Sequence, residues 1–192
     1  TCWAFAKVDI SADELFKAVA AKHGRIAGDY DVQHLSNIVS AFAKLNYKSE
    51  SLFKAMASQH LRIASDGTPQ ALSQFCWAFA TVGYKSEELF DAVAGERERI
   101  IRDGNDQALS NLCWAFATVG HQSEELFEAV AGEHERLVVR GGDELALSTI
   151  LWAVSAASER SWVHQAERSG GGGLPPSTTK VIPHFKNHFP RS

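Results

Sequence analysis

The segment LSNLCWAFATVG, from Leu109 to Gly120, decides the fold because the chain repeats it almost unchanged. The chain has LSQFCWAFATVG from Leu72 to Gly83 and LSNIVSAFAKLN from Leu35 to Asn46, so successive copies start 37 residues apart. A fixed period of roughly 20 to 50 residues is typical of stacked structural repeats. One column of the phrase follows this period, with a last step of 38: Trp3, Ser40, Trp77, Trp114 and Trp152.

Each copy predicts two amphipathic helices. The first helix carries apolar residues at the spacing i, i+3, i+4, i+7 and i+10: Leu72, Phe75, Cys76, Phe79 and Val82. Gly83 and Gly120 follow it as C-terminal stop signals. The second helix begins at the motif SEELF, where Ser86 and Ser123 are predicted N-cap residues. Its predicted buried stripe is Leu89, Phe90, Val93, Ile100 and Ile101.

The pattern predicts an all-α protein, an α-solenoid of helix-turn-helix repeats with a 37–38 residue period. Neither helix of a unit can bury its apolar face alone, so the units must stack. Residues 1–168 hold about five units, the first truncated and the last degenerate. Because the chain begins within a copy of the phrase, we expect it to be part of a longer protein. Residues 169–192 are predicted to be a Gly/Pro-rich linker and a disordered basic tail.

Catalytic and metal-binding motifs are missing from the sequence. The GGGG run at 170–173 lacks the Lys-Ser/Thr of a phosphate-binding loop, and His184 and His188 lack the Glu of a zincin helix. His121 and His134 are interpreted as surface variation within the repeat. We expect no enzymatic activity, cofactor, metal, small-molecule substrate or membrane span. Three cysteines share one repeat position and are predicted to be free and buried: Cys2, Cys76 and Cys113.

A polar stripe along the first helices is the candidate binding surface. It consists of the residues three before and four after the Trp column, which are seven apart and share one helix face. The candidate contacts are Asn37, Lys44, Gln74, Thr81, Asn111 and Thr118, with Lys7, Thr149 and Ala156 as weaker candidates. Amides and hydroxyls are the groups that recognise base edges. The alternative is a solvated surface without a ligand, and the Trp column is interpreted as packing between units, loosened at Ser40.

The distribution of charge bears on a nucleic-acid partner. A net charge of −4 argues against one. However, the segments His34–Lys48, Gln70–Lys85 and Gln107–Gln122 contain no acidic residue, and the acids cluster in the predicted second helices. A face built from the first helices would therefore be free of acids and carry a few lysines. Such a face would bind RNA more through bases than through phosphates, with a shallow salt dependence.

The phrase LSNLCWAFATVG followed by SEELFEAVA resembles the repeats of octotricopeptide-repeat proteins of organelles. It is also similar to the repeats of FAST-kinase-like and RAP-domain proteins and of the RNA-editing substrate-binding complex. The match is closest at Leu72–Gly83 and Leu109–Gly120 and partial at Leu35–Asn46 and Leu147–Ala157, and the resemblance covers about residues 1–157. No RAP domain is recognisable, so no activity of such a domain is carried over.

The resemblance implies a repeat module that binds single-stranded RNA sequence-selectively and acts in organellar RNA processing, stability or translation. It implies a mitochondrial location, in the matrix, with the chloroplast as the alternative. Ribonucleoprotein partners, in a granule, are a further expectation. The alternative function is a protein-interaction solenoid of armadillo or HEAT type, which apolar or acidic residues along the stripe would favour.

Overall fold

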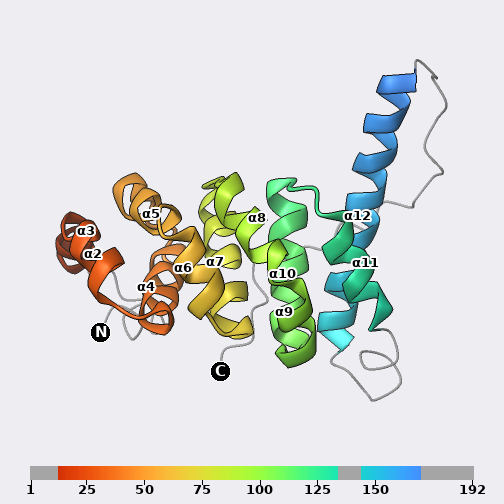
Figure 1. Cartoon of the computed structure of the whole chain (residues 1–192). Coiled ribbons are helices and arrows are strands. Elements are labelled where there is room, and N and C mark those ends of the chain that lie inside the picture. Colours follow the sequence, from red (N-terminus) through yellow and green to blue (C-terminus); the bar gives the residue numbers. More distant parts are fainter. Residues whose placement is uncertain (1–12, 134–143, 170–192) are drawn as a thin grey trace.

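The computed structural model describes residues 13–133 and the helix 144–169, with side chains of that helix described to residue 157. The elements of the described residues are all helices, without a strand, which confirms the predicted all-α repeat fold. The units follow one another along a single axis (Figure 1). The helices are α2 (Asp13–Ala21), α3 (His23–Asp29), α4 (Val32–Lys44), α5 (Glu50–Ala57), α6 (His60–Asp66), α7 (Pro69–Val82), α8 (Glu87–Gly95), α9 (Arg97–Asp103), α10 (Asp106–Val119), α11 (Glu124–Gly132) and α12 (Glu144–Ser169).

The helices form two layers. The first layer consists of α4, α7, α10 and α12, each packed on the next, and the second layer holds the remaining helices. In the second layer, contacts also link consecutive units, between α3 and α5, α6 and α8, and α9 and α11. One continuous apolar core lies between the layers, and its largest side chains include Phe42, Phe79 and Phe116. Stacking of units therefore buries the core, as the sequence predicted.

Periodic turns connect the helices. The first-layer helices begin at Asp31, Thr68 and Asn105, whose side chains accept hydrogen bonds from backbone N–H groups three residues on. The α7 and α10 helices end at Gly83 and Gly120 with φ of 74° and 72°, as the stop signals predicted. Of the predicted N-caps for the second helix, Ser86 accepts from Leu89 N, whereas Ser123 makes no such bond.

The sequence pattern predicted a single second helix in each unit. In the three units where this segment is described in full, residues 13–29, 50–66 and 87–103, it forms two helices instead. The break falls at Lys22, Gln59 and Glu96, where the backbone N–H bonds to the carbonyl three residues earlier instead of four. The break leaves carbonyls without helical partners, and the ring Nδ1 of His23 and of His60 lies 3.0 and 3.1 Å from the oxygens of Ala20 and Ala57. The apolar period is the same with or without the break, so periodicity alone could not reveal it.

The second short helix of two described units carries an arginine that binds the previous unit. The Arg62 guanidinium on α6 donates to the carbonyls of Ala27 and Tyr30 at the end of α3. Arg99 on α9 repeats this with Ala64 O and, at 2.6 Å, Gly67 O at the end of α6. These carbonyls belong to helix ends that have no further intrahelical donors. A cation there also suits the helix dipole.

An aromatic cluster fills the turn between the layers in each unit. Phe79 lies 5.0 Å from Phe53 and 5.5 Å from Tyr84, measured between ring centroids. In the next unit His121 takes the place of Tyr84, packs on the corresponding phenylalanine rings and has a side chain only 11% exposed. Its Nε2 lies 3.1 Å from Asp91 Oδ1. His121 is therefore a packing residue and not the surface variation that the sequence suggested, while His134 lies outside the described residues.

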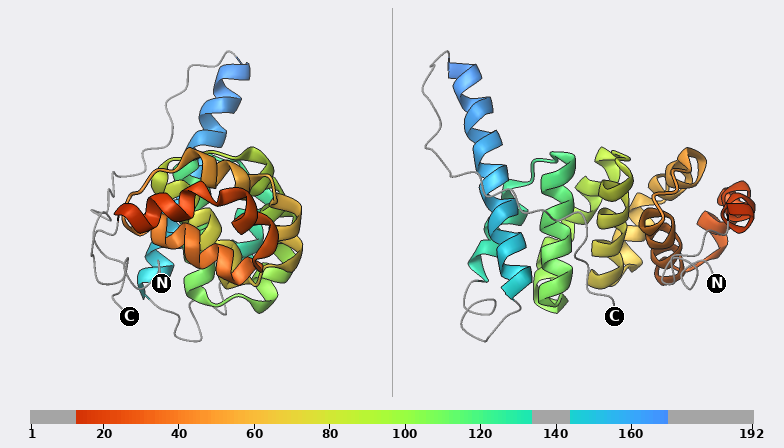
Figure 2. Two further views of the ribbon diagram at one scale, coloured as in Figure 1. Left: turned by 90° about the vertical axis from the view of Figure 1, so that its left-hand side faces the viewer. Right: turned by 180° about the vertical axis from the view of Figure 1, so that it is seen from behind.

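The last described helix departs from the pattern. Ser158 occupies the position of Gly83 and Gly120 after the Trp column. The chain makes no turn there, and α12, which is 26 residues long in all, continues to Ser169. Its second half projects from the end of the array, which Figure 2 shows both along the array and from behind. The last first-layer helix thus lacks the turn that ends α7 and α10. None of the described helices combines the length and the apolarity that crossing a bilayer requires.

Candidate nucleic-acid interface

The polar stripe is the accessible face of the first layer. Between Ala71 and Val82 on α7, only Gln74 and Thr81 are not buried. These positions are seven apart, so they point the same way while every other face of the helix packs against neighbours. On α10 the same positions hold Asn111, half-buried, and Thr118, exposed. The positions that the sequence selected are therefore among those that a ligand of the first layer could touch.

The stripe continues onto both neighbouring helices. On α4, Asn37 is half-buried and Lys44 is exposed. On α12, Thr149 and Ala156 are half-buried. Because α4, α7, α10 and α12 pack side by side, these residues form rows that cross four helices. Helix axes in such packing are about 8–10 Å apart. The weaker candidate Lys7 lies outside the described residues.

The hydrogen bonds within the stripe distinguish its members. The hydroxyls of Thr81 and Thr149 donate to Trp77 O and Leu145 O of their own helices, so they offer a ligand only acceptor oxygens. The side-chain oxygen of Gln74 is buried and has no hydrogen-bond partner within the described part of the chain. A buried acceptor without a partner is costly, and a ligand donor would relieve that cost. Gln74 is therefore the member of the stripe with an unmet hydrogen-bond acceptor.

The Trp column lies beside the stripe, and its described members are buried or half-buried. Trp77 is 9% exposed, and Trp114 and Trp152 are partly buried against the core. Ser40 occupies the column on α4, where its hydroxyl is buried and lacks a hydrogen-bond partner among the described residues. The packing interpretation of the column fits these burials, and Trp3 lies outside the described residues.

A second row of amides on the same face was missed by the sequence interpretation. Gln33, Gln70 and Gln107 lie four residues before Asn37, Gln74 and Asn111, and all three are exposed. Residues four apart lie above one another on a helix, so the two rows are adjacent. The 37-residue spacing of these glutamines was a signal that could have found them.

The two layers differ in charge. Along α4, α7 and α10 the only acidic residue is Asp106, at the start of α10. The second layer carries a series of exposed acids: Glu50, Glu87, Glu88, Asp91, Glu98, Glu124, Glu125 and Glu128. The exposed Lys44 ends α4, and the exposed Lys48 and Lys85 follow in the turns after α4 and α7. A polyanion would therefore meet the first layer with less repulsion than the second.

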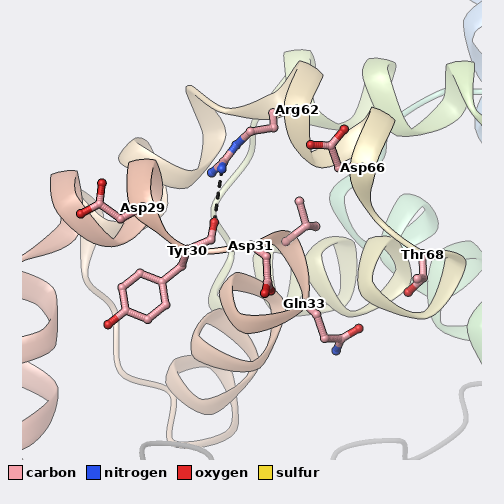
Figure 3. A pocket seen from close by; sticks show the side chains of 8 residues that line it. Asp29, Tyr30, Asp31, Gln33, Arg62, Asp66 and Thr68 are labelled. Atoms are coloured by element: carbon pink, nitrogen blue, oxygen red, sulfur yellow. Dashed lines mark hydrogen bonds between the residues drawn. The ribbon is translucent and has the colours of Figure 1, made fainter.

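A cavity of about 340 Å³ lies at the edge where consecutive units join, and Gln33 of the second amide row is one of its lining residues. Asp29, Asp31 and Asp66 line it together with Arg62, whose guanidinium reaches across to Tyr30 O (Figure 3). The backbone N–H of His34 donates to the Asp31 carboxylate and holds its pKa below the usual value. Three carboxylates line this cavity, and its one guanidinium already donates to a backbone carbonyl. The carboxylates would repel a phosphate, so the cavity is unsuited to one.

One comparison with known proteins finds a family that covers most of the chain. The family model of the RNA-editing substrate-binding complex 6 protein matches residues 1–156. This range includes the first layer as far as α12 and every residue of the stripe. No curated protein matches the chain.

Proposed function

Because the chain belongs to the family of RNA-editing substrate-binding complex 6 proteins, we propose that it binds single-stranded RNA sequence-selectively through the polar stripe. The family indicates a role in organellar RNA metabolism, within an RNA-editing substrate-binding complex. The proposed location is the mitochondrial matrix, since the family is mitochondrial in kinetoplastids. The proposed action is binding without catalysis, in support of transcript processing or stability.

One observation carries the proposal: the same polar position is accessible on every first-layer helix. Asn37, Gln74 and Asn111 occupy it on three adjacent helices, each half-buried and flanked by core residues. A primary amide both donates and accepts, so it can pair with the edge of an unpaired base. Helical-repeat RNA readers use two or three side chains for each base, and a unit here offers an amide together with Lys44, Thr81 or Thr118.

The test is selection of bound sequences from a random single-stranded RNA pool. We expect enrichment of a motif of about four or five bases, since such readers contact roughly one base per repeat. The Asn37→Ala/Gln74→Ala/Asn111→Ala variant should lose the motif and bind the selected RNA at least about tenfold more weakly. The control is Lys54→Ala/Glu128→Ala on α5 and α11, which removes one positive and one negative charge and leaves the net charge unchanged.

Two results would overturn the proposal. One is enrichment of the same motif by the amide variant, which would place recognition elsewhere. The other is the absence of enrichment together with no RNA retention at low salt, which would favour the protein-interaction solenoid. Helical content of each variant, measured by circular dichroism, separates a lost contact from a lost fold.

A further inference from the structure

The first-layer helices pack on each following helix through one repeated set of positions. These positions lie four before, one before and three after the Trp column. The residues are Ser36, Val39 and Ala43 on α4, Ser73, Cys76 and Ala80 on α7, and Ser110, Cys113 and Ala117 on α10, none more than 6% exposed. Three copies of one interface define a docking geometry that the chain uses between all its described units.

The same positions on α12 hold Ser148, Leu151 and Ser155, and all three are exposed. Leu151 is 67% exposed, whereas Cys113 at the same position on α10 is fully buried. On the opposite side of α12, Ala146 and Ala153 are 3% and 0% exposed because α12 packs on α10 there. The outer face of α12, defined by Ser148, Leu151 and Ser155, therefore continues the established interface without a partner in the described structure.

The interfaces between the described first-layer helices also indicate which kind of surface would pack on the outer face of α12. Each following helix offers two alanines seven apart: Ala71 and Ala78 on α7, Ala108 and Ala115 on α10, and Ala146 and Ala153 on α12. Small residues let helix backbones approach closely, so an apolar residue from the facing helix can insert between them. The complementary surface is thus an alanine-bearing face of a helix in another stacked unit.

We infer that the outer face of α12 binds the alanine-bearing helix face of a different helical-repeat protein, which extends the array across two chains. A second copy of this chain fits less well, because its described alanine pairs are buried in its own interfaces. Residues 170–192 do not repeat the phrase that forms a first-layer helix. This inference stands independently of RNA binding, because it uses a different face of the first layer.

The experiment places the photo-crosslinker p-benzoylphenylalanine at Leu151 of the full chain, expressed in cells that naturally make the protein. The matched control carries it at Leu61 on α6, which is 71% exposed in the second layer. We expect crosslinked peptides from position 151 that belong to another helical-repeat protein and carry two alanines seven apart in an amphipathic helix. Position 61 should not yield them.

A substitution supplies a quantitative readout. Leu151→Glu should reduce co-purification of the crosslinked protein roughly tenfold or more, because it removes an apolar contact and buries a charge. Leu61→Glu should leave it unchanged, and both variants should keep wild-type helical content and RNA binding. The inference is overturned by crosslinks from position 151 only to other parts of the same chain, only to a second copy of it, or at no more than the level of position 61.

Discussion

Arg62 and Arg99 show how single side chains fix the spacing of the array. Each lies 37 residues from the next and donates to two carbonyls at the end of the previous unit's last helix. The Arg99 side chain is 28% exposed and is also held by Glu96, with Nε 2.9 Å from Oε2. Arg25 occupies the same repeat position on α3, yet its side chain is 81% exposed and pairs only loosely with Asp29, at 3.7 Å. The sequence reveals the period of these arginines but not the carbonyls that they reach.

Replacing Arg99 by Ala should lower the free energy of unfolding by about 2 kcal/mol. It removes hydrogen bonds from a charged donor, each worth about 1.5–3 kcal/mol, and partial solvent exposure reduces their sum. The control, Arg25→Ala, removes the same guanidinium from a position that lies at no interface between described units. It should change stability by less than about 0.5 kcal/mol. Urea denaturation followed by circular dichroism measures both. Equal effects of the two substitutions would refute the role given to Arg99.

Cys76 and Cys113 are free and fully buried between first-layer helices, as the sequence predicted. Burial raises the pKa of both thiols, that of Cys113 to about 12. Only the thiolate reacts with alkylating or disulfide reagents, so reactivity in the native state requires pH near the raised pKa.

In a Cys2→Ser variant we therefore expect no modification by Ellman's reagent between pH 7 and 9. Addition of denaturant should expose two reactive thiols per chain. The native reaction should stay absent as the pH rises, because folded Cys113 remains protonated until about pH 12. Rapid labelling of either thiol in the native protein, followed by mass spectrometry of the labelled peptide, would contradict the interface as described.

At the scale of elements, one residue after each first-layer helix decides whether the chain turns. Asn46, Gly83 and Gly120 adopt φ of 50°, 74° and 72° and direct the chain to the second layer. Asparagine and glycine adopt this left-handed conformation more readily than other residues. Ser158 at the equivalent position lacks this preference, and α12 continues straight. The end of the regular repeat thus follows from one change in residue type, from asparagine or glycine to serine. The sequence alone did not show that the helix would continue through this serine.

Replacing Gly83 by Ala should cost about 1 kcal/mol of stability. A methyl group there meets no atom within 4 Å, so the cost is that of the left-handed backbone alone. Gly24→Ala on α3 is the matched control, since its methyl group also meets no atom within 4 Å and its backbone is helical. It should raise stability by up to about 1 kcal/mol. The two shifts in thermal midpoint should therefore have opposite signs, and a shared sign would disprove the argument.

Sequence periodicity predicted the first layer well and the second layer only in part. The spacing of Leu72, Phe75 and Phe79 identifies the buried face of α7, and the same spacing leaves Gln74 accessible. The break at Glu96 could not be predicted, because Val93 and Ile100 are seven apart and would share a face in a continuous helix. The contacts between units near the break, such as that of Arg99 with Gly67, join residues 32 apart in the chain, which local periodicity does not reveal.

At the scale of the whole molecule, the layers separate a polar face with few charges from an acidic one. The net charge of −4 therefore does not describe the surface that RNA would meet. The first-layer side offers Lys44, Lys48 and Lys85 as exposed cations. If all three contact phosphates, the logarithm of the binding constant should fall with the logarithm of salt concentration with a slope of about −2, at about 0.7 per contact.

If RNA binds as proposed, two variants should differ in how their RNA affinity depends on salt concentration. Lys48→Ala/Lys85→Ala should flatten the slope by about 1.4, because two phosphate contacts no longer release counterions. Asn37→Ala/Gln74→Ala/Asn111→Ala should weaken binding of the selected RNA at every salt concentration and leave the slope unchanged, since amides pair with bases and displace no counterions. Fluorescence anisotropy with the selected RNA from about 50 to 300 mM salt measures both slopes. A changed slope in the amide variant, or an unchanged one in the lysine variant, would mean that phosphates and bases do not contact these residues as assigned.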